Sequence, residues 1–298
     1  MNKPYFTIVN PAAGGGRCGR LAPEALGKLR AAGFDLEVHE TRERGEATGL
    51  VRNAYAAGFR EFIAVGGDGT AFEIVNGLFP EAAEGGRAAL GFLPLGTGNS
   101  FLRDFTDRGP DFALEAILEH RRRRCDVIRL EHSEGSLYYI NTLNLGFAAD
   151  VATLTNRRLK KLGEPGYVAG VLISLARLRR QPFPLRADGQ RDARRCLFLA
   201  FSNSKYTGGK MMIAPEAAID SGTIEYVHWG PIGRLGLVRN LPSLFDGTHM
   251  SHPMATRRTA KRIDFEINGP VNIVVDGEAL RFEVKSLEVL PGALDVMV

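Results

Sequence analysis

Cysteine is scarce in this chain of 298 residues, which contains only three. Cys18, Cys125 and Cys196 are widely spaced, odd in number and never arranged as CxxC. A disulfide framework needs paired cysteines and a structural zinc site needs closely spaced thiolates, so the sequence argues against both. We therefore expect a chain that folds on its hydrophobic core in a reducing compartment.

Long apolar segments are also missing. Polar side chains interrupt residues 137–154, and residues 166–178 are too short to cross a bilayer of about 30 Å. The amino-terminal residues contain no apolar stretch typical of a signal peptide. We expect a cytoplasmic protein that contacts membranes only transiently.

The excess of positive charge is small, with a formal net charge of +4 and an isoelectric point of about 9.0. An excess of this size suits anionic partners such as nucleotide phosphates or acidic lipid headgroups, and it is too weak to indicate nucleic acid. The sequence does not fix the oligomeric state and leaves a homodimer open.

Strand and helix signals alternate over residues 1–126. Apolar strands are predicted at residues 5–9, 34–39, 62–65 and 89–93, and helices at residues 47–57 and 71–78. A further helix is predicted before Gly33, with Leu21, Leu26 and Leu29 on its buried face. This alternation is typical of a parallel α/β sheet, which binds ligands at the carboxyl ends of its strands.

The pattern changes after residue 126. Runs typical of β-strands dominate, at residues 126–131, 138–145, 197–203, 223–229, 263–267, 271–275 and 281–284. Helical insertions are predicted at residues 166–180 and 232–245. We expect a mostly antiparallel second domain over residues 127–285, with the tail 286–298 able to pack back on the first domain.

A glycine-rich turn follows each of three predicted strands, at residues 10–16, 66–70 and 94–99. Glycine lets a ligand approach backbone N–H groups closely, and a following helix adds the positive end of its dipole, so each turn is a candidate phosphate site. Asp68 in the middle turn could hold Mg²⁺ or stabilise the turn itself. None of the turns reads GxxxxGK[ST], and the first lacks GxGxxG, which argues against Walker-type ATPases and Rossmann dehydrogenases.

A second candidate site lies near the carboxyl terminus, where Asp276-Gly277-Glu278 follows an apolar strand. A carboxylate held near phosphates can accept the proton of an attacking hydroxyl. An ordinary Asp-Gly hairpin turn explains the same residues, and spacing alone favours the turn.

The three turns, NPAAGGG, GGDGT and PLGTGN, resemble in order and spacing the signature loops of the diacylglycerol kinase catalytic-domain family. This family includes bacterial lipid kinases and is related to sphingosine and ceramide kinases. The resemblance extends from Tyr5 to Val298. GGDG alone is shared with NAD kinases and phosphofructokinases, whereas its combination with the flanking loops is far more specific.

The resemblance implies an NAD kinase-like α/β domain that binds ATP and Mg²⁺, followed by a β-sandwich that binds the lipid substrate. It implies transfer of the ATP γ-phosphoryl group to a lipid hydroxyl, such as that of diacylglycerol or a sphingoid lipid, in phospholipid biosynthesis. Glu278 would be the proton acceptor, with Asp276 orienting groups beside it and Asp68 organising the metal. The implied nucleotide-binding residues are Asn10, Thr41, Gly66, Gly67, Asp68, Gly69, Thr70, Glu73, Gly96, Thr97, Gly98 and Asn99.

Two positions depart from the family pattern. Ser100 replaces the aspartate that commonly follows GTGN, and Ser221 replaces the aspartate with which bacterial relatives bind a structural Mg²⁺. Asp220 is then the remaining carboxylate for a second metal, because a serine hydroxyl is a poor ligand for a hard cation. Two alternatives stay open: a soluble-substrate kinase of the NAD kinase type, which shares the GGDG loop, and a non-catalytic nucleotide- or lipid-binding module, which the two departures favour.

Basic residues flank the apolar segment 167–178. Such an amphipathic element suits docking on an anionic membrane, and a core-packing helix with a solvated basic rim is the alternative. The basic residues are Arg157, Arg158, Lys160, Lys161, Arg177, Arg179 and Arg180.

Overall fold

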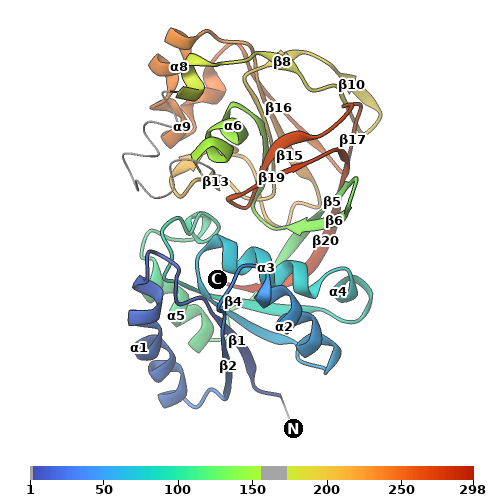
Figure 1. Ribbon diagram of the computed structural model, residues 1–298. Helices are drawn as coiled ribbons and strands as arrows, with labels where there is room; N and C mark the ends of the chain where they lie inside the picture. The colour runs from blue at the N-terminus through green and yellow to red at the C-terminus, as the bar shows by residue number, and fades with distance from the viewer. Residues whose placement is uncertain (1–2, 156–172) are drawn as a thin grey trace. The chain divides into compact units, whose positions relative to one another are not determined.

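The structure, a computed structural model, describes residues 3–155 and 173–298 (Figure 1). The chain divides into two units: unit 1 comprises Met1–Val127 and Leu290–Val298, and unit 2 comprises Ile128–Val289. Unit 1 is an α/β unit with a parallel sheet, and unit 2 is an antiparallel β-sandwich. The expected fold class is therefore confirmed.

The sheet of unit 1 has the strand order β20-β4-β3-β1-β2, with every pair parallel. The last residues of the chain complete this sheet, because β20 pairs with β4 from Leu294 to Met297. Every residue of β4 is buried, as is typical of a central parallel strand. The strands are β1 Tyr5–Val9, β2 Leu36–Glu40, β3 Glu61–Gly66, β4 Ala88–Pro94 and β20 Val284–Met297.

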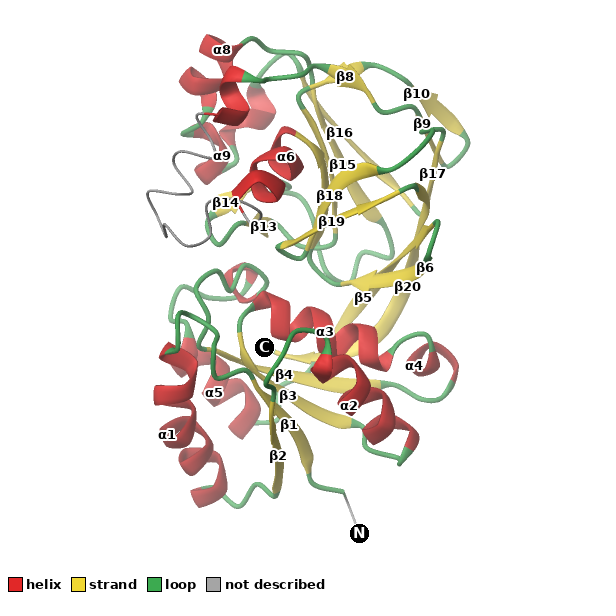
Figure 2. Cartoon of the chain, in the orientation of Figure 1, coloured by secondary structure: helices red, strands yellow, loops and turns green. Residues whose placement is uncertain are grey.

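Helices cover both faces of this sheet, with α1 and α5 on one face and α2 and α3 on the other (Figure 2). Helix α1 buries Cys18, Ala22, Leu26 and Leu29, which recur at the spacing of one helical face. The expectation for Leu21 was wrong: its side chain is 36% exposed, because it lies on the flank of that stripe. The helices are α1 Arg17–Ala31, α2 Glu46–Ala56, α3 Asp68–Leu78, α4 Glu81–Glu84, α5 Pro110–Leu118 and a 3₁₀ turn at Leu102–Asp104.

Two antiparallel layers form unit 2. One is a six-stranded sheet in the order β16-β15-β12-β7-β18-β19, and the other contains β10, β9, β17, β5, β6 and the first part of β20. Phe201 of β12 stacks on Tyr226 of β15 and meets Phe265 of β17 edge-on at 5.4 Å, so aromatic side chains join the two layers.

The strands of the six-stranded sheet are β7 Thr142–Gly146, β12 Phe198–Ser202, β15 Ile224–Trp229, β16 Ala255–Ala260, β18 Val271–Val275 and β19 Glu278–Phe282. The other layer adds β5 Arg123–His132, β6 Gly135–Tyr139, β9 Leu185–Ala187, β10 Gln190–Asp192 and β17 Arg262–Phe265. Two small ribbons pair β8 Gln181–Pro182 with β11 Arg195–Cys196, and β13 Tyr206–Thr207 with β14 Met211–Met212. The helices are α6 Phe147–Leu154, α8 Arg234–Asn240, α9 Ser243–Asp246 and a 3₁₀ turn at Thr248–Ser251.

Two predicted elements are divided in the structure. The strand expected at residues 138–145 breaks between β6 and β7, where a distant carboxylate binds the backbone, as described below. The helix expected at residues 232–245 becomes α8 and α9, because Pro242 has no N–H to continue a helix.

Part of the predicted basic element lies outside the described residues. This applies to Arg157, Arg158, Lys160 and Lys161, and to residues 166–172 of the helix expected at residues 166–180. In the described remainder, residues 173–176 are helical and residues 178–180 are not, so the helix ends earlier than expected. Within the part of the chain that the structure describes, no helix has both the length and the apolar character that crossing a membrane requires.

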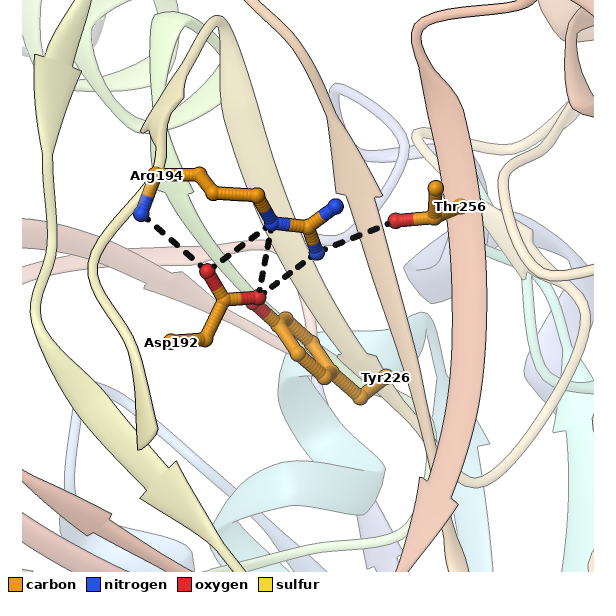
Figure 3. A network of polar contacts seen from close by, with 4 residues as sticks. All are labelled: Asp192, Arg194, Tyr226 and Thr256. Atoms are coloured by element: carbon orange, nitrogen blue, oxygen red, sulfur yellow. Dashed lines mark hydrogen bonds and ion pairs between the residues drawn. The ribbon is translucent and has the colours of Figure 1, made fainter. Parts of the chain in front are cut away.

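A buried carboxylate links the two layers of unit 2 (Figure 3). Asp192, at the end of β10, accepts hydrogen bonds from Arg194 Nη2 at 2.6 Å and from the Tyr226 hydroxyl at 3.0 Å. Arg194 also donates to Thr256 Oγ1 of β16 at 3.2 Å. Burial alone would raise the pKa of Asp192, but these hydrogen bonds and the charge of Arg194 outweigh it and hold the pKa well below its usual range.

We expect Asp192→Asn to lower the free energy of unfolding of unit 2 by about 2 kcal/mol at neutral pH, because it removes a charged acceptor from Arg194 and Tyr226. The folded-state pKa of Asp192 is depressed, so its contribution is present above the unfolded pKa of about 3.9 and is lost as the pH falls through the folded pKa. Urea unfolding followed by the fluorescence of Trp229, the single tryptophan, measures the difference at pH 7 and in acid.

Asp264→Asn is the matched control, because Asp264 pairs with Arg262 on the surface and its side chain is 45% exposed. It should change the unfolding free energy by less than about 1 kcal/mol. Equal effects of the two substitutions would contradict a structural role for the Asp192 network.

Candidate functional site

Three glycine-rich loops lie side by side at the carboxyl edge of the unit 1 sheet, after β1, β3 and β4. Backbone hydrogen bonds join them: Asn10 N–H donates to Val65 O at 3.0 Å, and Gly96 N–H donates to Gly66 O at 2.8 Å. The first loop leads into α1 and the second into α3, so two helix N-termini begin at this edge. This is the edge at which open α/β sheets bind ligands.

Close backbone approaches explain why these loops are rich in glycine. A Cβ atom on Gly96 would lie 2.5 Å from Gly67 Cα, and one on Gly14 would lie 2.9 Å from Leu95 O. Real Cβ atoms do not tolerate the first distance, so a side chain on Gly96 would force the loops apart. The glycines therefore bring the three loops together as well as leaving N–H groups open to a ligand.

Asp68 begins α3 and binds the loop that follows β4. Its carboxylate accepts the N–H of Ser100 at 2.9 Å and the N–H of Phe101 at 3.4 Å. Burial raises the pKa of Asp68, and the hydrogen bonds from Ser100 and Phe101 partly oppose that rise. Asp68 thus stabilises the neighbouring loop as well as its own turn.

The departure at Ser100 also has a physical consequence. The residue is buried, and its hydroxyl adds a hydrogen bond to Asp68 beside that of its backbone N–H. An aspartate here would place a second negative charge against the first. In this chain Asp68 is therefore the single carboxylate of the turn, supported by serine donors.

Two buried polar atoms near Asp68 have no hydrogen-bond partner within the described structure, Thr70 Oγ1 and Asn99 Oδ1. Asn99 adopts a left-handed conformation with φ of 52°, and its Nδ2 donates to Pro94 O and Gly96 O. These bonds leave its carbonyl oxygen as an oriented acceptor. An unsatisfied buried polar atom is costly, so this loop is suited to a bound donor, cation or water.

A cavity of about 160 Å³ opens beside the third loop. Thr97 and Gly98 line it, together with two cations that the sequence interpretation missed, Arg17 and Arg103. Arg17 directly follows the run of three glycines and begins α1, and this position was the signal that could have identified it. Guanidinium groups bind phosphate in a bidentate manner.

The other expected nucleotide residues lie in the same unit. Asn10 Oδ1 accepts the N–H of Ala12 at 3.2 Å, and Thr41 Oγ1 donates to Val9 O at 3.4 Å, both at the carboxyl edge of the sheet. Gly66 ends β3, Gly67 precedes Asp68, and Gly69 and Thr70 follow it in the first turn of α3.

Glu73 has a structural role that spacing did not reveal. Its carboxylate accepts the N–H groups of Gly45 and Ala47 at 2.9 and 3.2 Å, at the N-terminus of α2. A negative charge there satisfies unpaired N–H groups and stabilises the helix dipole. Nucleotide contact by Glu73 stays a prediction.

In unit 2, Asp276 and Gly277 form the two-residue connection between β18 and β19, with Val275 paired to Glu278. Both have positive φ, 47° and 87°, as in a type I′ hairpin turn. The hairpin interpretation is therefore correct, and it leaves Glu278 at the first position of β19, partly buried.

The Asp276 carboxylate does more than form the turn. It is 3% exposed and accepts three backbone N–H groups, those of Ile140 and Asn141 at 3.1 Å and that of Thr142 at 2.9 Å. These bonds occupy the break between β6 and β7, which explains why one predicted strand is two. Burial, and secondarily the charge of Asp276, raises the pKa of Tyr139 well above its usual value.

Polar side chains surround this break. Asn203 Nδ2 donates to Ile140 O at 2.9 Å, and the Ser204 hydroxyl contacts Asn141 Oδ1. The DG turn, defined as Asp276 to Glu278, thus rests on a buried polar cluster.

The candidate second metal position lies on the surface of unit 2. Asp220 and Ser221 are exposed, and the Ser221 hydroxyl is engaged with Thr223, donating to its carbonyl oxygen at 3.1 Å. Among residues 3–155 and 173–298, no three His, Cys, Asp or Glu side chains converge in a preformed metal centre. Metal binding by Asp220 stays a prediction.

Comparisons with known proteins cover nearly the whole chain. Residues 4–130 match the family model described as "Diacylglycerol kinase catalytic domain", and residues 141–298 match "YegS C-terminal NAD kinase beta sandwich-like domain". A protein of Chromohalobacter salexigens named "Probable lipid kinase YegS-like" is 34% identical, over 91% of this chain and 86% of the relative. A "Diacylglycerol kinase" of Mycobacterium tuberculosis H37Rv is 28% identical, over 97% of this chain and 93% of the relative. A solved Bacillus anthracis str. Sterne structure matches with a TM-score of 0.78 and 25% identity, over 99% of this chain and 94% of the other.

We expect Gly96→Ala to weaken nucleotide binding at least tenfold and to destabilise unit 1 by about 1–3 kcal/mol, because its Cβ would meet the backbone of Gly67. Calorimetric titration with ATP and thermal unfolding measure the two effects.

Gly27→Ala is the control, because a Cβ at that position in α1 would meet no described atom within 4 Å beyond its chain neighbours and the backbone of its own helix. It should be neutral or stabilise the fold by about 0.5–1 kcal/mol, as alanine favours a helix. If both variants bind ATP and unfold alike, close approach of the loops is not what requires glycine at position 96.

Proposed function

Because the chain belongs to the diacylglycerol kinase family of lipid kinases, we propose that it transfers the γ-phosphoryl group of ATP to a lipid hydroxyl. The observation that carries the proposal is the interlocked set of glycine loops, with Asp68 bound to the loop that contains Thr97 and Asn99. Phosphoryl transfer depends on positioning and charge stabilisation, which such a rigid cradle can supply.

The glycine loops hold the nucleotide phosphates in this proposal. Backbone N–H groups at the N-termini of α1 and α3 face the carboxyl edge of the sheet, where a helix dipole favours anions. Arg17 and Arg103 line the adjacent cavity together with Asp107. Arg103 pairs with Asp107 at 3.4 Å, so Arg17 supplies the net positive charge there. Asn10, Thr41 and Thr97 supply polar groups at the same edge.

The residues present also fit a magnesium ion. Asp68 and Asn99 offer the hard oxygen atoms that Mg²⁺ prefers, and the Oδ1 atom of Asn99 has no partner within the described structure. They would hold the ion directly or through water. When bound, Mg²⁺ neutralises negative charge on the phosphates.

Glu278 is the proposed general base. Asp276 locks the turn beside it through three backbone hydrogen bonds, so the backbone at Glu278 is fixed. The lipid hydroxyl oxygen forms a bond to the γ-phosphorus while the bond from that phosphorus to the β–γ bridging oxygen breaks and ADP leaves. The hydroxyl proton passes to the Glu278 carboxylate.

Diacylglycerol is the proposed acceptor, since the Mycobacterium tuberculosis relative carries the name "Diacylglycerol kinase". A sphingoid-type lipid is the second acceptor to test. Both present a primary hydroxyl beside long apolar chains, so an interfacial assay in mixed micelles can compare them directly.

We expect Glu278→Gln to lower kcat by at least about 10²-fold while ATP binding stays unchanged, because the amide cannot accept the proton. The measurement is transfer of labelled phosphate from ATP, with Mg²⁺, to diacylglycerol and sphingoid lipids in mixed micelles. Glu283→Gln is the matched control, since Glu283 is an exposed carboxylate just past the end of β19, and its activity should match that of the unaltered chain.

Full activity in Glu278→Gln would remove this residue from the chemistry. Labelling of a soluble acceptor instead of any lipid would favour a kinase of the NAD kinase type. ATP binding without any transfer would favour a nucleotide-binding module.

A further inference from the structure

Unit 2 contains a polar cavity of about 370 Å³ that shares no lining residue with the glycine loops or with the DG turn. It lies where α6 packs on β18 and β19. The polar residues that line it are Arg177, Arg179, Arg281, Asp150, Asn272, Ser174 and Gln181. Its volume suits a ligand group of several heavy atoms.

The three arginines of this cavity differ from most others in unit 2. Six arginines of the unit form ion pairs with carboxylates: Arg129, Arg186, Arg191, Arg194, Arg257 and Arg262. Within the described part of the chain, Arg177, Arg179 and Arg281 form no side-chain ion pair or hydrogen bond. Three exposed guanidinium groups thus line one cavity, and none of their donors has a partner among the described residues.

Asp150 is the single carboxylate among the lining residues, and it accepts a hydrogen bond from the neutral side chain of Asn272. Asn272 Nδ2 donates to Asp150 Oδ1 at 3.0 Å, which connects β18 to α6. Asn272 also pairs directly across the ladder with Arg281 of β19, so the two side chains project from the same face of the sheet. The cavity therefore has three positive charges against one negative charge.

We propose that this cavity is a binding site for a phosphate group, separate from the nucleotide loops. Guanidinium groups present paired N–H donors that match the oxygens of a phosphate monoester or diester. The buried residue Ser174 adds a small hydroxyl to the lining. The phosphate belongs to a lipid headgroup or to a free phosphate, because both offer the same oxyanion.

Binding at this site does not depend on the proposed phosphoryl transfer. It requires no ATP, and it uses none of the residues assigned to the nucleotide or to the general base. Failure of either proposal would therefore leave the other standing.

The test compares two double variants of the full chain that lose the same charge. Arg179→Gln/Arg281→Gln removes two cavity arginines, and Arg195→Gln/Arg258→Gln removes two exposed arginines that do not line it. Binding is measured without ATP, by titration with inorganic phosphate and by co-sedimentation with phosphatidylcholine vesicles with or without phosphatidic acid. The emission of Trp229 and the melting temperature verify that each variant is folded.

We expect the cavity variant to lose at least tenfold in affinity, and the control less than about threefold, since hydrogen bonds to charged groups are worth roughly a factor of ten each. Arg281→Lys keeps the charge but loses the paired donors, so it should lie between the unaltered chain and Arg281→Gln. Loss with both probes identifies a site that free phosphate can fill, and loss with acidic vesicles alone identifies a lipid headgroup site.

Equal losses in the two double variants would overturn the proposal, because general surface charge would then explain binding. Absence of binding by the unaltered chain to both inorganic phosphate and acidic vesicles would overturn it as well.

Discussion

Hydrogen bonds from backbone N–H groups to two carboxylates hold the loops on which each candidate site depends. Asp68 accepts two N–H groups of the loop after β4, and Asp276 accepts three from the break between β6 and β7. Glycine turns expose backbone donors that need acceptors once they are buried, and a carboxylate can satisfy several donors at once. Asp68 and Asp276, which the sequence motifs indicated as candidate catalytic residues, thus also stabilise the local fold.

This constraint separates the roles of neighbouring acids. Asp276 is buried and committed to the backbone, whereas Glu278 is partly buried at the first position of the next strand. A fixed acceptor cannot readily take part in proton transfer, while a carboxylate beside a locked turn keeps its position and its capacity for a proton. Glu73 in unit 1 is likewise a candidate site residue with a structural role, because its carboxylate accepts backbone N–H groups at the N-terminus of α2.

Local sequence pattern was enough to predict most of the fold. For example, the apolar runs of the sequence correctly predicted the strands β1, β3, β4 and β18. Local pattern failed where residues distant in the sequence determine which side chains are buried or where a strand ends. Leu21 matched a helical spacing, yet the sheet buries the stripe containing Cys18 and Ala22 instead. The break between β6 and β7 depends on Asp276, more than 130 residues away. The cavity proposed to bind phosphate is lined by residues from α6 to β19, which no single motif contains.

The fate of the γ-phosphoryl group tests the central claim most directly. ATP labelled with ¹⁸O in the non-bridging γ-oxygens would be incubated with the protein, Mg²⁺ and diacylglycerol micelles, and the lipids analysed by mass spectrometry. Direct transfer predicts a phosphorylated lipid that retains all of the γ label. Label found only in inorganic phosphate, with the lipid unchanged, would show hydrolysis of ATP and contradict the assignment of a lipid hydroxyl as acceptor.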